Sequence, residues 1–241
     1  MTKIKWIYLV VIIISVGAVL FFYNAFNGNP ISKMTAQSTL KNHLESNYPD
    51  DEFVIQREFY NFKDGGYNFY VTQIGEEEQT EYEFILTGFF GSNIHSDGIY
   101  YANQDVKLIS KLQKEASEEI TNLLQEKVPE VLEVTPQLEV LKGKYPSDAN
   151  WSKDFKAEKP MYIHITIDSR KFSKEDMLHA SILIQRSLHE SNYTYEHITI
   201  NGNIIDENYE EVKGEPFWVV KYAVGFEHDT KLTLKDIEQY E

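Results

Sequence analysis

The chain has 241 residues, no cysteine, and 23 lysines and arginines against 38 aspartates and glutamates, which gives a formal net charge of −15. This excess of acid argues against nucleic-acid binding, because contacts to phosphates need a basic surface, and against electrostatic adhesion to anionic lipid. The absence of cysteine excludes disulfides and an anchor built on a lipid-modified cysteine. Apolar residues make up 42% of the chain, which is enough to bury a core.

Residues 1–26 predict a cytoplasmic tail and a transmembrane anchor. The chain carries no charge from Trp6 to Phe26, and roughly 20 apolar residues in a helix cross the hydrocarbon core of a bilayer. Aromatic residues lie at both ends of this segment, as in the aromatic belts of membrane helices. Lys3 and Lys5 precede it. The positive-inside rule therefore predicts a single-pass protein of the cell membrane with a cytoplasmic N-terminus and an extracellular C-terminal part.

A cleaved signal peptide is the alternative for the same segment. Its apolar region is typically about 7–15 residues long and ends in a cleavage site of small residues. Here the apolar run is longer and ends in the bulky residues Phe21, Phe22 and Tyr23. The sequence therefore favours an anchor that is not cleaved.

Residues 27–97 predict a small module made of one helix and an antiparallel meander. Asn27–Pro30 is rich in helix breakers and predicts a hinge after the anchor. A helix follows over 31–47, where Ala36, Leu40 and Leu44 share one face. Alternating apolar residues then predict three strands, over 53–59, 67–74 and 81–87.

Residues 98–241 predict a larger module of the same kind, with the boundary inside the looser stretch 88–103. Its elements are a helix over 104–127, strands over 138–141, 161–168, 195–201 and 217–226, a helix to Ser191 opened by a capping box at Ser173–Asp176, and a closing helix over 234–241. Residues 145–160 read as a loop, and Asn201-Gly202 as a turn. The fold class is α+β: a transmembrane helix, then two modules of helix plus antiparallel sheet.

Several short patterns occur in a fixed order in the first third of the chain. They are the membrane run, Asn27–Pro30, Asn47-Tyr48-Pro49, Phe53-Val54-Ile55, Tyr60–Lys63 and an aromatic strand from Tyr67. Over roughly residues 1–87 this order resembles the YfjL-like membrane-anchored proteins of Bacillus-type bacteria. The resemblance implies an anchored, extracytoplasmic protein of a Gram-positive cell. It transfers no catalytic residue to this chain.

Two fragments of enzyme motifs occur, and neither is complete. Ser38 and Lys41 have the S-x-x-K spacing of acyl-serine enzymes. Ser96-Asp97-Gly98 only partly matches the second motif of those enzymes, and Lys-Thr-Gly is missing, so a solvated helix face is favoured. His189-Glu190 begins like a zinc-protease motif, but Tyr193 stands where the second histidine is required.

Oxygen-bearing side chains recur at every second position in one loop, as in calcium sites: Asp148, Asn150, Ser152 and Asp154. Lys153 and Lys159 replace the glycine and the glutamate of an EF-hand, which excludes that motif and leaves a looser cation contact as the alternative.

Other polar groups are weaker candidates. His164 and Asp168 face outward on one predicted strand, and His197 does so on another, so the three converge on a metal or acid–base site only if those strands are neighbours. Asp50–Glu52 and Glu76–Glu78 are acidic runs at turns, where a solvated turn is favoured over a site for cations or a basic partner.

Aromatic residues occupy both faces of some strands, at Tyr67–Tyr70 and at Phe217-Trp218. Core packing explains most of them, and a sheet surface for a partner is the alternative. We therefore expect a module of the cell envelope that binds a protein or peptide through a sheet face or edge. A hydrolase with an unrecognised site and an accessory protein that responds to ions or pH are the alternatives. The sequence assigns no catalytic residue, metal ligand or cofactor.

Overall fold

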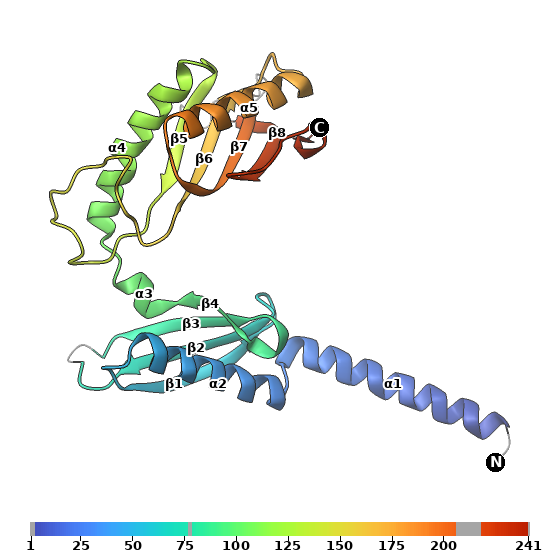
Figure 1. Cartoon of the computed structure of the whole chain (residues 1–241). Coiled ribbons are helices and arrows are strands. Elements are labelled where there is room, and N and C mark those ends of the chain that lie inside the picture. The colour runs from blue at the N-terminus through green and yellow to red at the C-terminus, as the bar shows by residue number, and fades with distance from the viewer. Residues whose placement is uncertain (1–2, 77–78, 206–217, 241) are drawn as a thin grey trace. The chain divides into compact units, whose positions relative to one another are not determined.

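The computed structural model describes residues 3–76, 79–205 and 218–240. The chain divides into two units, Met1–Asn103 and Gln104–Glu241, each with a hydrophobic core of its own (Figure 1). Each unit combines helices with one sheet. The predicted α+β class is therefore confirmed.

The N-terminal unit begins with two helices, α1 (Lys3–Asn27) and α2 (Pro30–Asn47). The described side chains of α1 are all exposed. Its apolar segment is long enough to cross a membrane, a property that a signal sequence near the N-terminus shares. The length and apolar composition of α1 thus agree with the predicted N-terminal span.

The helix break predicted at Asn27–Pro30 separates α1 from α2, and it is a hydrogen-bonded turn. Gly28 adopts a positive φ of 68°, and Asn29 caps α2 in a reciprocal pair of hydrogen bonds with Ser32. The buried hydroxyl of Tyr67 accepts from the Asn29 backbone N–H at 3.1 Å and donates to the Asn29 carbonyl at 3.0 Å. A side chain of the sheet therefore holds the turn directly.

The first sheet is an antiparallel meander with the strand order β1-β2-β3-β4. Its elements, with the short helices that follow β3 and β4, are β1 (Phe53–Asn61), β2 (Gly66–Gln73), β3 (Glu81–Thr87), η1 (Phe89–Gly91), β4 (Asn93–Asp97) and α3 (Gly98–Ala102). Strand β4 lies in the stretch predicted to be loose. Its five residues alternate weakly in polarity, and its pairing with β3 defines it.

Helix α2 covers one face of this sheet and closes the first core. Ala36 and Leu40 are fully buried and Leu44 nearly so, as their i, i+4, i+8 spacing predicts. The largest buried side chains they face are Phe69 of β2 and Phe84 of β3.

The second sheet has the order β5-β6-β7-β8-β9 and lies against two helices. The elements of this unit are α4 (Val106–Gln125), β5 (Val131–Gln137), β6 (Met161–Asp168), α5 (Lys174–Glu190), β7 (Tyr195–Ile205), β8 (Trp218–Glu227), η2 (Leu234–Asp236) and β9 (Glu238–Gln239). The predicted alternation of β6 is confirmed, because Met161, Ile163, Ile165 and Ile167 are buried.

The strand pair β6–β7 runs parallel, where the sequence analysis expects antiparallel strands throughout. The other pairs of the sheet are antiparallel. The difference has a simple cause: α5 returns the chain to the starting end of β6 before β7 begins, which is how parallel strands are connected.

Three predicted elements of this unit are wrong. The strand predicted over 138–141 is not formed there, because the strand of this region, β5, ends at Gln137. The Asn201-Gly202 turn is absent, because β7 continues through it to Ile205 and pairs with β8. The closing helix over 234–241 is replaced by the turn η2 and the two-residue strand β9.

Candidate functional site

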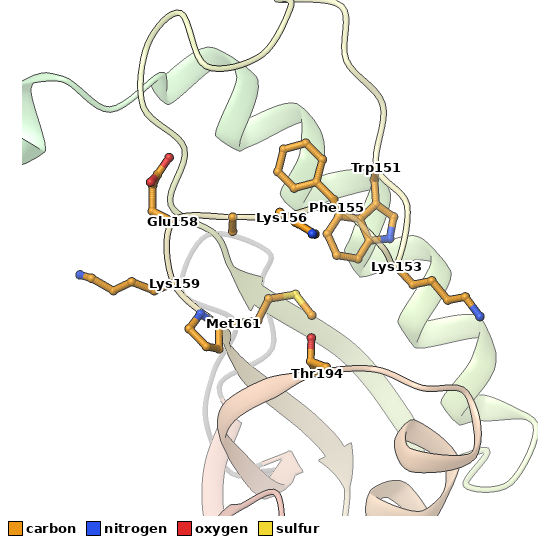
Figure 2. A pocket seen from close by; sticks show the side chains of 10 residues that line it. Trp151, Lys153, Phe155, Lys156, Glu158, Lys159, Met161 and Thr194 are labelled. Atoms are coloured by element: carbon orange, nitrogen blue, oxygen red, sulfur yellow. The ribbon is translucent and has the colours of Figure 1, made fainter.

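A cavity of about 300 Å³ opens in the C-terminal unit, where the loop before β6 folds back on itself (Figure 2). This volume is at the small end of the range for ligand pockets. Its lining consists of Trp151, Lys153, Phe155, Lys156, Ala157, Glu158, Lys159, Pro160, Met161 and Thr194. We call it the lysine pocket.

Helix α4 fixes the loop that forms the pocket. The Lys111 ammonium donates to the backbone oxygens of Asp148 and Ala149 at 2.9 and 2.8 Å, and to Asn150 Oδ1 at 2.8 Å. One turn further along α4, Glu115 accepts from the Trp151 backbone N–H at 2.7 Å. Both side chains project from one face of the helix, so the start of the pocket wall is positioned by a regular element.

Aromatic rings build the apolar part of the wall. The Phe155 ring lies 4.5 Å from the Tyr145 ring and 6.3 Å from Trp151, centroid to centroid. Figure 2 shows the Trp151 indole and the Phe155 ring side by side above Met161. The Trp151 indole nitrogen is buried and has no hydrogen-bond partner among the described residues. A buried donor of this kind is costly unless a ligand or water accepts from it.

The charge of the pocket opposes that of the chain. Glu158 is paired with Lys144 at 2.6 Å, and Lys159 with Glu139 at 2.9 Å. Lys153 and Lys156 are exposed and form no ion pair within the described residues. Two free ammonium groups, an indole N–H and an apolar wall together fit an anion that also carries a hydrogen-bond acceptor.

This site is not among those predicted from the motifs, although the sequence contains a signal for it. Residues 142–159 hold five lysines and three acids in a chain whose net charge is −15. A local reversal of charge around tryptophan and phenylalanine is a usable indication of a binding loop.

The calcium-like loop uses two backbone carbonyl oxygens and one of its four patterned side chains, Asn150, to bind a lysine. These three oxygen atoms converge on the Lys111 ammonium. Among the residues that the structure describes, no group of three or more metal-binding side chains gathers anywhere.

The three outward residues of the second sheet do not form one site. Strands β6 and β7 are neighbours, and the register sets Tyr162 opposite His197 and Asp168 opposite Asn203. Asp168 is held by its own neighbour Arg170 at 2.5 Å, and this guanidinium keeps the pKa of the carboxyl below its usual value. His164 lies in the middle of β6, opposite Thr199 of β7, and Asp168 lies four residues further on, at the end of β6.

The S-x-x-K residues do not form a catalytic pair either. Ser38 is exposed, and Lys41 lies 3.8 Å from Glu45 on the same helix. Asp97 instead accepts hydrogen bonds from His43 at 2.7 Å and from Tyr48 at 2.9 Å. Burial, and then the Asp97 carboxylate, raise the pKa of the Tyr48 phenol. This group fastens the end of α2 to the start of α3.

His189 takes part in a cluster other than a zinc site. Its ring stacks on that of His228 with centroids 4.0 Å apart, and its Nε2 lies 2.8 Å from the Tyr195 hydroxyl. Because the two rings are nearly parallel, their nitrogen lone pairs do not converge on one ion. Burial, and then the charge of His228, lower the pKa of His189. Burial, and then the charge of Asp229, raise the pKa of Tyr195 to about 12.

The remaining candidates are local or fall outside the described residues. Asp51 accepts from Gln73 at 2.6 Å, and Glu76 from Tyr82 at 2.9 Å, while 77–78 are outside the description. In the double-sided strand, Tyr67 and Phe69 enter the core. Phe217 and the Trp218 side chain lie outside the described part.

On the other face of β2, Tyr70 donates to Glu83 at 2.6 Å and lies under the Arg57 guanidinium, 3.7 Å from the ring centroid. The Tyr70 side chain is thus already engaged by partners of its own sheet.

The chain matches known proteins along most of its length. Residues 3–98 match the YfjL-like N-terminal domain, and residues 115–238 match the YfjL-like C-terminal domain. "Uncharacterized protein YfjL" of Bacillus subtilis (strain 168) is 27% identical over 235 residues, which cover 98% of both chains.

Among solved structures, a DUF5037 family protein from Ruminococcus gnavus ATCC 29149 is 10% identical and covers 70% of this chain and 74% of its own, with a TM-score of 0.21. That score is too low to support any argument about the fold. The two domain matches are sufficient by themselves, and the chain belongs to the YfjL-like family.

Proposed function

We propose that this protein is a single-pass, membrane-anchored binding protein of the cell envelope, with α1 as its anchor and its C-terminal unit outside the cell. The apolar length of α1 and the two lysines before it support this topology. The lysine pocket is the binding site in this proposal, and its ligand is a peptide segment that carries carboxylate groups.

The observation that carries the proposal is the unpartnered Trp151 indole N–H beside the unpaired ammonium groups of Lys153 and Lys156. A peptide carboxylate pairs with the lysines, a peptide carbonyl accepts from the indole, and an apolar side chain packs on Phe155. Each group of the pocket thereby gains the partner that its chemistry requires. The acidic surface elsewhere repels acidic peptides and so favours this loop as the place of contact.

The test is an array of acidic hexapeptides probed with the full-length protein in detergent. A second array carries the same peptides with each Glu and Asp replaced by Gln and Asn. We expect binding to the acidic array alone and a marked fall in binding at high salt, because exposed charge pairs are screened. Equal binding to both arrays, or to neither, contradicts the proposal.

Matched variants assign the binding to the pocket. The pair Lys153→Glu and Lys156→Glu should abolish it. The pair Lys231→Glu and Lys235→Glu makes the same change in net charge at exposed positions outside the pocket and should leave it intact. Trp151→Phe keeps a ring and removes the N–H, and should weaken binding roughly fivefold, the value of about one hydrogen bond.

A second candidate function, a response to pH, rests on the stacked pair of His189 and His228. Two imidazoles at this distance repel one another when both are protonated, so acidification disfavours their packing.

A further inference from the structure

We propose that the N-terminal unit carries a lipid-contacting collar around the C-terminal end of α1, and that its side chains enter the interfacial layer of the bilayer. The collar consists of Phe26, Ile31, Met34, Phe62, Phe89 and Phe90. This inference rests on the proposal that α1 spans the membrane, and it adds that the folded unit itself touches the lipid.

Three separate segments meet at this end of the unit. The first is the α1–α2 junction, and Ile31 and Met34 lie in the first turns of α2, which begins at Pro30. The Phe62 ring, in the β1–β2 turn, lies 5.5 Å from the Phe26 ring of α1. The β3–β4 connection carries Phe89 and Phe90, and Figure 1 shows it beside the C-terminal end of α1. A shallow cavity joins the same parts, since Asn24 of α1 and the segment 88–91 both line it.

The exposure of these side chains is unusual for a folded surface. Phe89 is 81% exposed, Met34 69%, Ile31 68% and Phe62 54%. Single exposed apolar residues need no explanation, but a cluster of large ones marks a surface that another phase or molecule covers.

The backbone supports the same view. Phe90 has a φ of 55°, between Gly88 at 81° and Gly91 at 69°. A bulky residue in the left-handed region is strained, and such strain is retained where the structure uses it. Here the turn projects two adjacent aromatic rings, 4.3 Å apart, outward from the end of the sheet.

The bilayer is the occupant that the rest of the molecule favours. The collar is continuous with the apolar helix α1, so the two form one surface. The segments that bear it, 27–35, 59–67 and 88–95, contain two lysines and one aspartate, whereas the whole chain has 23 basic and 38 acidic residues. Aromatic side chains without acidic neighbours are typical of the interface between lipid and water.

The test uses the absence of native cysteine, which lets each single-cysteine variant carry one nitroxide label. The full-length protein is reconstituted in phosphatidylcholine vesicles. Labels are placed at Phe62→Cys and Phe89→Cys in the collar, and at Val16→Cys within α1. The matched control is Ile74→Cys, which is 55% exposed and follows the opposite end of β2. At each position, the collision rate of the nitroxide with oxygen, which partitions into lipid, is compared with its collision rate with a water-soluble nickel complex.

We expect oxygen to dominate at 16, at 62 and at 89, and the nickel complex to dominate at 74. Lipid exposure at 16 with water exposure at 62 and 89 overturns the collar and leaves the anchor standing. Water exposure at 16 overturns both. Protection of 62 and 89 from both reagents, with spin–spin broadening that grows with protein density, identifies a second copy of the chain as the occupant and also overturns the collar.

Discussion

At the scale of single residues, Tyr67 connects the first sheet to the turn between α1 and α2. Its ring is buried and its hydroxyl meets the backbone of Asn29 on both the donor and the acceptor side, with the Ser32 hydroxyl 2.7 Å away. Removing that oxygen deletes its hydrogen bonds to Asn29 and Ser32, and leaves the Ser32 hydroxyl as the weaker partner of the Asn29 N–H, at 3.4 Å.

Tyr67→Phe should therefore lower the free energy of unfolding of the N-terminal unit by about 1–2 kcal/mol. The measurement is urea denaturation of the full-length protein. Tyr101→Phe removes the same atom from a side chain that is 51% exposed and should change little. A Tyr67→Phe protein as stable as the Tyr101→Phe protein would show that the turn does not depend on this hydroxyl.

The pair of His189 and His228 predicts a dependence on pH. Burial, and then the charge of His228, lower the pKa of His189 in the folded state, so the unfolded chain takes up the proton first as pH falls. The contribution of neutral His189 to the free energy of unfolding is complete above its unfolded pKa of about 6.5. It is lost as the pH falls through that value toward the lower pKa of the folded state.

His189→Gln keeps a polar group near Tyr195 and does not titrate. Its denaturation midpoint for the C-terminal unit should therefore fall less between pH 7.5 and pH 5.5 than that of the wild type. If the denaturation midpoints of the two proteins fall equally between these pH values, the imidazole pair is not a sensor of pH.

At the scale of elements, strands β2 and β3 approach so closely that only glycine fits at the start of β2. A Cβ added at Gly66 would lie 2.1 Å from the carbonyl oxygen of Leu86, a backbone atom that cannot rotate away. At the adjacent Gly65 an added Cβ meets nothing within 4 Å, although its φ of 64° strains other residues.

Gly66→Ala should destabilise the N-terminal unit by about 3 kcal/mol, the upper part of the range for overpacking, because the two strands must separate. Gly65→Ala should cost about 1 kcal/mol from backbone strain alone. The comparison is made on the denaturation midpoints of the two variants. Equal midpoints would mean that the meander yields at Gly66 without loss.

Elements with strong periodicity were predictable, and those defined by their neighbours were not. The faces of α2 and β6 follow from spacing, and the capping box at Ser173 marks the start of α5. Strand β4 and the passage of β7 through Asn201-Gly202 depend on pairing with β3 and β8, which local sequence does not encode. Residues typical of a turn remain in a strand where the neighbouring strands on both sides pair with them.

At the scale of the whole molecule, the two cores contain no residue in common. Phe69 is fully buried in the first and Ile165 in the second. Two units with separate cores should unfold in two transitions, each sensitive only to changes in its own core.

Phe69→Ala should lower the free energy of unfolding of the N-terminal unit by about 3–5 kcal/mol. Ile165→Ala should lower that of the C-terminal unit by about 2–5 kcal/mol. Calorimetry of the full-length protein separates the two transitions. If either variant shifts both transitions by similar amounts, the chain unfolds as one cooperative body, and the two units do not unfold independently.

The candidate site was less predictable than the fold because it depends on which charges remain unpaired. Sequence gives five lysines in residues 142–159. The structure shows that Glu158 and Lys159 are already paired, and that Lys153 and Lys156 form no ion pair with the part of the chain that it describes. The buried indole nitrogen of Trp151 is likewise a fact of packing.

The contacts of Lys111 have a consequence for the surroundings in which the protein can work. Loops that bind a divalent ion through alternating oxygen donors lose order when the ion is removed. Here the Lys111 ammonium, which is part of the chain, binds the carbonyl oxygens of Asp148 and Ala149 and Oδ1 of Asn150 without a dissolved ion. We expect the melting temperature of the C-terminal unit to be the same in excess EDTA and in millimolar calcium. The loop therefore keeps its shape whatever the concentration of divalent ions around the protein.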